Sequence, residues 1–139
     1  MAEGLKIGEL AKRTGCPVET IRYYEREGLL PVPDRSEGNY RLYTIEHVER
    51  LSFVRHCRSL DMTIGEIRIL LIYHDAPESK CGEVNTLLDG HIAQVEKRIV
   101  QLNKLKSQLR ELRRLCGEGG MAKDCGILNE LSHPIKQAQ

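Results

Sequence analysis

The chain has 139 residues, with 21 Lys and Arg against 20 Asp and Glu, for a formal net charge of +1. This near balance excludes a uniformly basic nucleic-acid-binding surface and a long acidic tail. No apolar run approaches the roughly 18 residues of a membrane span, and the first residues lack the apolar stretch of a secretory signal. We therefore expect a cytoplasmic protein with no membrane partner.

Two short helices are expected near the N-terminus. Ile7 and Leu10 begin an apolar stripe of helical spacing, and Gly15 follows it at a position typical of a helix stop. Pro17 suits the first position of a second helix, which continues to about Gly28. Two helices joined by about three residues predict a helix-turn-helix.

A small hairpin and two further helices are expected next. A Gly-Asn turn at residues 38–39 precedes the alternating Tyr-Arg-Leu-Tyr of residues 40–43, which is typical of a hairpin and would form a wing. Thr44 can cap a third helix. Thr63 and Glu66 form a capping box for a fourth.

This stretch is locally basic and rich in tyrosine, although the whole chain is nearly neutral. A helix fits the DNA major groove, where arginines meet phosphates or guanine edges and tyrosine hydroxyls donate to phosphate. The candidate DNA-binding residues are Arg22, Tyr23, Tyr24, Arg26, Tyr40 and Arg41. Tyr43 is a further candidate for a phosphate contact. The alternative is a protein-binding helical domain with a solvated charged face.

An apolar stripe of coiled-coil spacing runs through the second half of the chain. Its members are Leu88, Ile92, Val95, Ile99, Leu102, Leu105, Leu109, Leu112 and Cys116. A long helix with one such stripe has no other segment of this chain to pack against, so we expect a homodimer built on an antiparallel coiled coil. The predicted fold is mainly α. It comprises a winged helix-turn-helix DNA-binding and coupling domain (1–76), a dimerisation helix (77–116) and a metal-binding loop with a short C-terminal helix (117–139).

Five widely separated cysteines make a poor disulfide framework. Cys16 and Cys57 are expected to be packing residues. Cys81 and Cys116 are 35 residues apart, about 50 Å along one helix, so they cannot share a metal ion within one chain. In an antiparallel pair, Cys81 of one subunit falls beside Cys116 of the other. A glycine-rich loop lets Cys125 fold back to the same point, which predicts three thiolates at each end of the dimer.

Thiolate-only ligation selects soft ions. A three-sulfur site suits lead(II), cadmium(II) or mercury(II), whereas structural zinc(II) normally takes four ligands and should bind more weakly. Asp124 and His133 are the nearest possible fourth donors. Asp124 could also cap the final helix and place Cys125 at the positive end of its dipole. The alternative is that Cys116 is only a packing residue of the apolar stripe.

Catalysis has little support in the sequence. The histidines form no HExxH pattern, no Ser or Cys lies in a nucleophile elbow, and no glycine-rich phosphate loop is present. We therefore do not expect an enzyme. Two other classes stay open: a redox sensor acting through thiol oxidation or an iron–sulfur cluster, and a metal-storage protein in which the helix-turn-helix is only a scaffold.

Several segments resemble the MerR family of transcriptional regulators. The N-terminal domain of that family is matched by IGELA (7–11), TIRYYEREGLL (20–30) and GNYRLY (38–43). CRSLDMT (57–63), CGEVN (81–85) and CGIL (125–128) resemble its lead- and cadmium-responsive branch. The chain ends in SHPIKQAQ rather than in a histidine-rich tail, which favours lead.

The resemblance implies a metal-sensing transcriptional activator. Such dimers bind a palindrome between two promoter elements whose spacer is longer than RNA polymerase prefers. Metal binding re-orients the DNA-binding domains, which bend and untwist the spacer. It implies DNA contacts at Arg22, Tyr23, Tyr24, Tyr40 and Arg41, and Cys81, Cys116 and Cys125 as ligands of lead(II), or alternatively of cadmium(II) or mercury(II). The third and fourth helices would couple the two ends.

Overall fold

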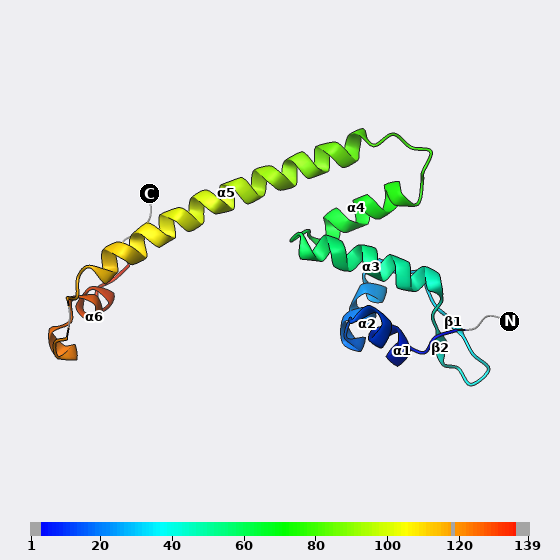
Figure 1. Cartoon of the computed structure of the whole chain (residues 1–139), viewed down its shortest axis with the longest axis horizontal. Helices are drawn as coiled ribbons and strands as arrows, with labels where there is room; N and C mark the ends of the chain where they lie inside the picture. The colour runs from blue at the N-terminus through cyan, green and yellow to red at the C-terminus, as the bar shows by residue number, and fades with distance from the viewer. Residues whose placement is uncertain (1–3, 118, 136–139) are drawn as a thin grey trace. The chain divides into compact units, whose positions relative to one another are not determined.

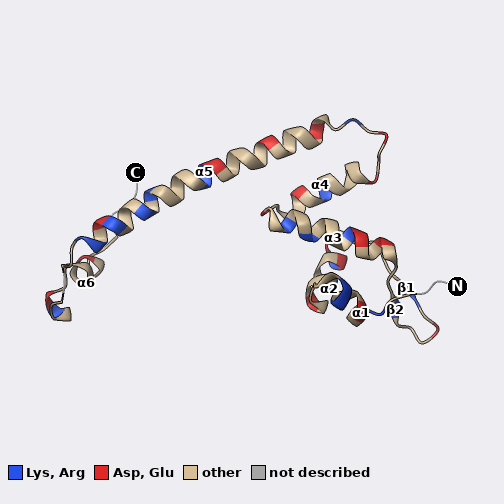
Figure 2. Ribbon diagram, in the orientation of Figure 1, with Lys and Arg blue, Asp and Glu red and all other residues tan. Residues whose placement is uncertain are grey.

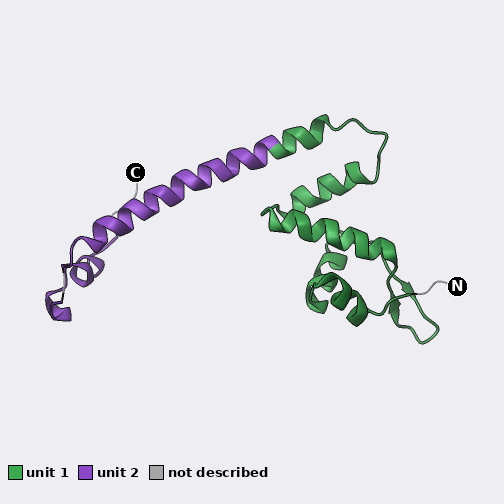
Figure 3. Cartoon of the chain, viewed as in Figure 1, with its two compact units in different colours: residues 1–88 green, residues 89–139 purple. Residues whose placement is uncertain are grey.

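The structure, a computed structural model, describes residues 4–117 and 119–135 and confirms the predicted mainly helical fold (Figure 1). Its elements are α1 (Ile7–Thr14), α2 (Val18–Arg26), β1 (Asp34–Arg35), β2 (Arg41–Leu42), α3 (Ile45–Ser59), α4 (Ile64–His74), α5 (Gly82–Arg113), a 3-10 turn η1 (Ala122–Asp124) and α6 (Gly126–Leu131). The chain divides into two compact units, residues 1–88 and 89–139 (Figure 3). Residues 1–3, 118 and 136–139 of the first and third predicted domains lie outside the described residues.

The helix-turn-helix is present as predicted. Gly15 ends α1 with φ of 69°, a left-handed conformation that glycine adopts without strain, and its N–H donates to the Ala11 carbonyl at 2.8 Å. Pro17, with φ of −59°, is the N-cap of α2, so this helix begins at Val18, one residue later than predicted. Leu10 and Ile21 are fully buried, so each helix contributes its apolar face to the core.

The wing is a two-stranded hairpin in which Asp34 pairs with Leu42 and Arg35 with Arg41. Asn39 closes the turn with φ of 64°. A contact that the sequence pattern did not indicate joins the N-terminal segment to the wing. Leu5 and Tyr43 exchange two backbone hydrogen bonds of 2.7 and 2.8 Å.

Both expected helix caps are present in the first unit. The Thr44 N–H donates to His47 Nδ1 at 3.0 Å at the start of α3. At the start of α4, Thr63 N–H donates to the Glu66 carboxylate at 2.9 Å and Glu66 N–H donates to the Thr63 hydroxyl at 3.1 Å. These reciprocal bonds satisfy donors that a helix start would otherwise leave unpaired.

The core of the first unit is mainly aliphatic. Its fully buried side chains are Leu10, Ile21, Leu29, Tyr43, Leu51, Val54 and Ile67. Cys16 and Cys57 belong to the same core, as predicted, with 3% and 7% of their surface exposed. Burial raises the pKa of both thiols, which keeps them protonated at neutral pH.

The predicted long helix is α5, which has 32 residues and lies within the expected 77–116 region. The second unit contains most of α5, then η1 and α6. No helix of the described ranges 4–117 and 119–135 is both long and apolar enough to cross a membrane.

Candidate functional site

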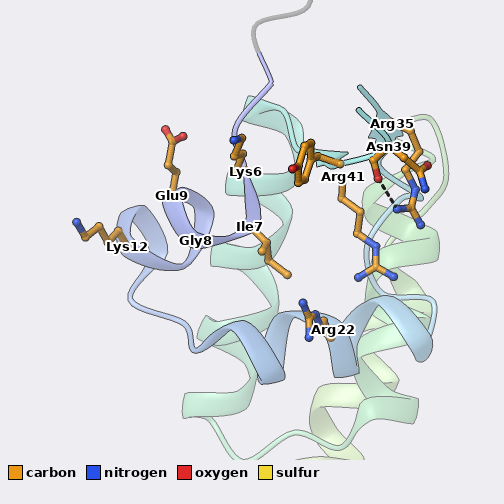
Figure 4. A pocket seen from close by; sticks show the side chains of 10 residues that line it. Lys6, Ile7, Gly8, Glu9, Lys12, Arg22, Arg35, Asn39 and Arg41 are labelled. Carbon is orange, nitrogen blue, oxygen red and sulfur yellow. Dashed lines mark hydrogen bonds between the residues drawn. The ribbon is translucent and has the colours of Figure 1, made fainter. Parts of the chain in front are cut away.

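A basic hollow of about 680 Å³ lies beside the first turn of α1 (Figure 4). It is lined by Lys6, Ile7, Gly8, Glu9, Lys12, Arg22, Arg35, Asn39, Tyr40 and Arg41. Figure 4 shows Arg22 of α2 and Arg41 of β2 directed into the same space. Five of these side chains are cationic and one is acidic, which suits the phosphate backbone of a nucleic acid.

A second hollow, of about 300 Å³, shares Arg22, Arg35 and Arg41 with the first and adds Arg26. Glu25 lines it too, and its carboxylate lies 3.8 Å from the Arg41 guanidinium. The predicted arginines 22, 26 and 41 are therefore brought together between α2 and the wing. Arg35, which also lines both hollows, was not among the sequence-based candidates.

The four tyrosines of this region divide into two exposed and two buried side chains. Tyr23 is 40% exposed, and Tyr40 is 60% exposed with Lys6 Nζ 4.9 Å from its ring centre. Tyr24 lies in the core with 6% exposed. Tyr43 is fully buried and its hydroxyl donates to Glu25 at 2.7 Å, so the expectation of a phosphate contact from Tyr43 is wrong. Burial first, and then this hydrogen bond, raise the pKa of Tyr43.

In the second unit, the structure brings two of the three predicted thiol ligands together. Cys116 and Cys125 are both half-buried and their side chains share a hydrogen bond. The pKa of Cys125 lies below its usual value, mainly because the Leu128 backbone amide and then the Cys116 thiol stabilise the thiolate. The pKa of Cys116 is raised, first by the same hydrogen bond. Once Cys125 has ionised, the remaining thiol proton of the pair is therefore on Cys116.

The loop that returns Cys125 to Cys116 depends on a glycine. A Cβ at Gly126 would collide with the backbone carbonyl of Leu115, so only glycine allows this approach. Arg113 donates to the Cys116 carbonyl at 2.7 Å and closes the end of α5. The N-cap of α6 is Cys125 itself, whereas Asp124 belongs to η1, so the expectation that Asp124 caps this helix is wrong.

The two thiols should differ in reactivity in the metal-free protein. Because the thiolate is the nucleophile, we expect iodoacetamide to modify Cys125 before Cys116 at pH 7. A lowered pKa populates the Cys125 thiolate at lower pH. The difference between the two modification rates should therefore shrink as pH rises and Cys116 ionises too. Peptide mass spectrometry over pH 6–9 would measure both rates. Buried Cys16 is the slow internal control, and faster modification of Cys116 would contradict the assignment.

The third predicted ligand, Cys81, is exposed and directly precedes α5. It borders a hollow of about 350 Å³ with Phe53 of α3 and Tyr73 and His74 of α4. Within the described part of one chain, no three His, Cys, Asp or Glu side chains are grouped as a metal site requires. The His133 ring lies 2.8 Å from the Asn129 carbonyl.

The apolar stripe of α5 lies open in the single chain. Ile92, Val95, Ile99, Leu102, Leu105 and Leu109 are all exposed. Charged residues of both signs are distributed along the same helix (Figure 2). An apolar stripe of this length on a helix otherwise rich in charge is the pattern of a helix that packs against a partner.

The fold and the basic hollow define the class of protein, a DNA-binding transcriptional regulator with a winged helix-turn-helix. Two family models cover most of the chain: "MerR HTH family regulatory protein" matches residues 5–73, and "MerR, DNA binding" matches residues 48–112. The chain belongs to the MerR family.

Individual relatives indicate the metal-responsive members of this family. A ZntR homologue, an HTH-type transcriptional regulator of Haemophilus influenzae, is 50% identical over 109 residues, covering 78% of this chain and 81% of its own. The lead(II) complex of the regulator PbrR691 from Ralstonia metallidurans has a TM-score of 0.82 and 53% identity, covering 92% of this chain and 99% of its own.

A more distant structure is the mercury(II) complex of MerR from Bacillus megaterium, with a TM-score of 0.71 and 31% identity. It covers 93% of this chain and 100% of its own. The protein is thus a metal-responsive MerR-type transcriptional regulator, and its relatives are regulators rather than enzymes.

Proposed function

We propose that this protein binds a palindromic promoter as a homodimer and activates transcription when a soft divalent ion, lead(II), occupies a site of three thiolates. The observation that carries the proposal is the pairing of Cys116 with Cys125 at the end of α5. Two converging sulfur atoms, one of them with a lowered pKa, fit the donor set that soft ions prefer. Lead is placed first because of the 53% identity to a regulator solved with lead(II).

The third ligand is assigned to the partner subunit's Cys81. Cys81 precedes α5 and Cys116 follows it, and a helix of 32 residues rises about 48 Å. Antiparallel pairing of two α5 helices through their open apolar stripes would bring the partner subunit's Cys81 to the Cys116–Cys125 pair. The donor set then consists of three cysteines, with one site at each end of the dimer.

On DNA, the cationic side chains that line the two hollows hold the phosphate backbone, and the exposed Tyr23 and Tyr40 can donate to it. When metal ions occupy its thiolate sites, the dimer bends and untwists the spacer between the promoter elements, so that RNA polymerase can open the promoter. Cells would use such a regulator to control export or sequestration of a toxic ion.

Titration of one preparation with lead, cadmium, mercury and zinc tests this function. We expect a thiolate-to-metal absorbance band that saturates at one lead ion per subunit, and lead-dependent transcription from a palindromic promoter by RNA polymerase. Cadmium or mercury acting at lower concentration than lead would change the assigned ion. Failure of all four ions to raise transcription would refute the activator function, and colour in the protein as isolated would instead favour an iron–sulfur sensor.

A further inference from the structure

Three arginines of α3 and α4 hold the carbonyl ends of the two helix-turn-helix elements. Arg55 donates to the Thr14 carbonyl at the end of α1. Arg68 donates to the Glu27 carbonyl, which caps α2, at 2.8 and 3.1 Å, and Arg50 Nε donates to the Leu29 carbonyl at 3.0 Å. Cationic donors at the C-terminal ends of helices satisfy carbonyls that have no partner within the helix. α3 and α4 therefore hold the DNA-reading helices through their ends.

Arg50 differs from the other two because it has a second partner on α4. Its Nη1 and Nη2 each lie 2.7 Å from one carboxylate oxygen of Asp75, the residue that caps the end of α4. This paired arrangement is strongly directional, so the two groups move together or separate. Only 17% of the Arg50 side chain is exposed, and the contact lowers the pKa of Asp75 to about 2. One guanidinium thus joins the end of α2 to the end of α4.

Asp75 is also the first residue of the short connection to Cys81. A turn braces this connection, in which the Ser79 N–H and hydroxyl both donate to the Ala76 carbonyl, at 2.9 and 2.6 Å. Pro77 and Cys81 line the same hollow as Phe53 of α3 and His74 of α4. The connection is therefore short and internally bonded, and it borders a hollow that both coupling helices also line. Few free residues are left between Cys81 and Asp75 to absorb a displacement of Cys81.

We propose that the Arg50–Asp75 pair transmits the state of Cys81 to the turn that ends α2, and so acts as a positioning pair for activation. The inference rests on the proposed function, since it assumes that Cys81 is drawn into the thiolate site. A shift of residues 75–81 moves the Asp75 carboxylate, and the paired contact passes that shift to Arg50 and the Leu29 carbonyl. Arg68 also holds the end of α2, because it donates to the main-chain carbonyl and the carboxylate of Glu27. Unlike Arg50, it has no such link to Asp75.

Asp75→Asn tests the pair, because it keeps the size of the side chain and removes the charge and one of the two acceptors. We expect promoter affinity without metal, and lead affinity by thiolate absorbance, to stay within about threefold of wild type, the range of most surface substitutions. Lead-dependent transcription should fall at least about fivefold, the lower end of typical coupling between sites. Asp75→Glu, which restores the carboxylate, should recover a substantial part of the induction.

Glu78→Gln is the matched control, since it makes the same chemical change in the same connection on an exposed side chain. It should keep wild-type induction. Full induction in Asp75→Asn would overturn the proposal, and so would a parallel loss of lead affinity or promoter affinity, because the pair would then act on binding. If wild type itself shows no metal-dependent transcription, the proposed function fails instead.

A second variant covers the case in which Asp75→Asn loses its helical circular dichroism. Arg50→Lys keeps the charge but cannot reach the Leu29 carbonyl and both Asp75 oxygens at once. Like Asp75→Asn, it should keep its promoter affinity and its lead affinity but lose lead-dependent transcription. Retained induction in Arg50→Lys would overturn the proposal.

Discussion

A mixed dimer of one Cys81→Ser chain and one Cys116→Ser chain should bind a single lead ion, although homodimers of either variant bind none under the same conditions. In the proposed antiparallel arrangement, the Cys116→Ser chain still supplies its Cys81 to the intact Cys116–Cys125 pair of the other chain. The opposite end lacks two ligands. Losing one direct ligand should cost more than the roughly 10–100-fold in affinity lost when a supporting residue is removed.

Differently tagged chains allow the mixed dimer to be isolated and titrated by thiolate absorbance. A mixed dimer of Cys116→Ser with Cys125→Ser is the control. It should bind no lead, because the structure pairs these two cysteines within one chain and neither pair is then complete. A Cys81→Ser and Cys116→Ser mixed dimer that binds no lead would contradict the antiparallel assignment.

Ile99→Lys should dissociate the dimer and weaken promoter binding at least about 100-fold, the scale on which linked binding modules exceed single ones. Ile99 lies on the apolar stripe of α5 and is 52% exposed in the single chain. In a coiled coil its side chain would face the partner helix, where a lysine at the seam is poorly tolerated. Sedimentation velocity and promoter binding would measure the two effects.

The neighbouring residue provides a matched control. Val100 is also β-branched and is 68% exposed, but it lies off the stripe. Val100→Lys should therefore leave the dimer and its promoter affinity unchanged within about threefold, as expected for a surface substitution. Dissociation by both variants, or by neither, would place the dimer interface elsewhere.

Local signals in the sequence were enough to predict much of the first unit. Gly15, Pro17 and the Thr63–Glu66 box each act within a few residues, so the helix boundaries they indicate agree with the structure to within one residue. The long helix followed from the periodicity of its apolar residues. Its dimeric pairing stays a prediction, because a sequence pattern shows that a face needs a partner but does not supply that partner.

Long-range contacts between side chains could not be predicted in this way. Arg50 and Asp75 are 25 positions apart, and the chain offers many other arginine and acidic residues. Tyr43 stands among basic residues and resembled a DNA contact. In the fold it is buried, bridged to Leu5 and hydrogen-bonded to Glu25, and no local periodicity indicates these contacts.

The candidate thiol site was predicted in part. Glycines after α5 suggested that Cys125 could return to Cys116, and the structure brings the two together. That Cys125 caps α6 itself was missed, because a cap depends on the conformation of the preceding loop. Gly126 directly after Cys125 was the available signal, since a glycine at the start of a helix can indicate a close backbone approach.

The backbone contact at Gly126 has a consequence for how ions of different radius would be distinguished. Because Gly126 lies against the Leu115 carbonyl, Cys125 is held close to the end of α5 by the main chain and not only by its side chain. In the proposed dimer, a larger ion would sit farther from this pair, and the partner subunit's Cys81 would move outward with it. In the proposed dimer, ionic radius is therefore converted into the distance between two subunits.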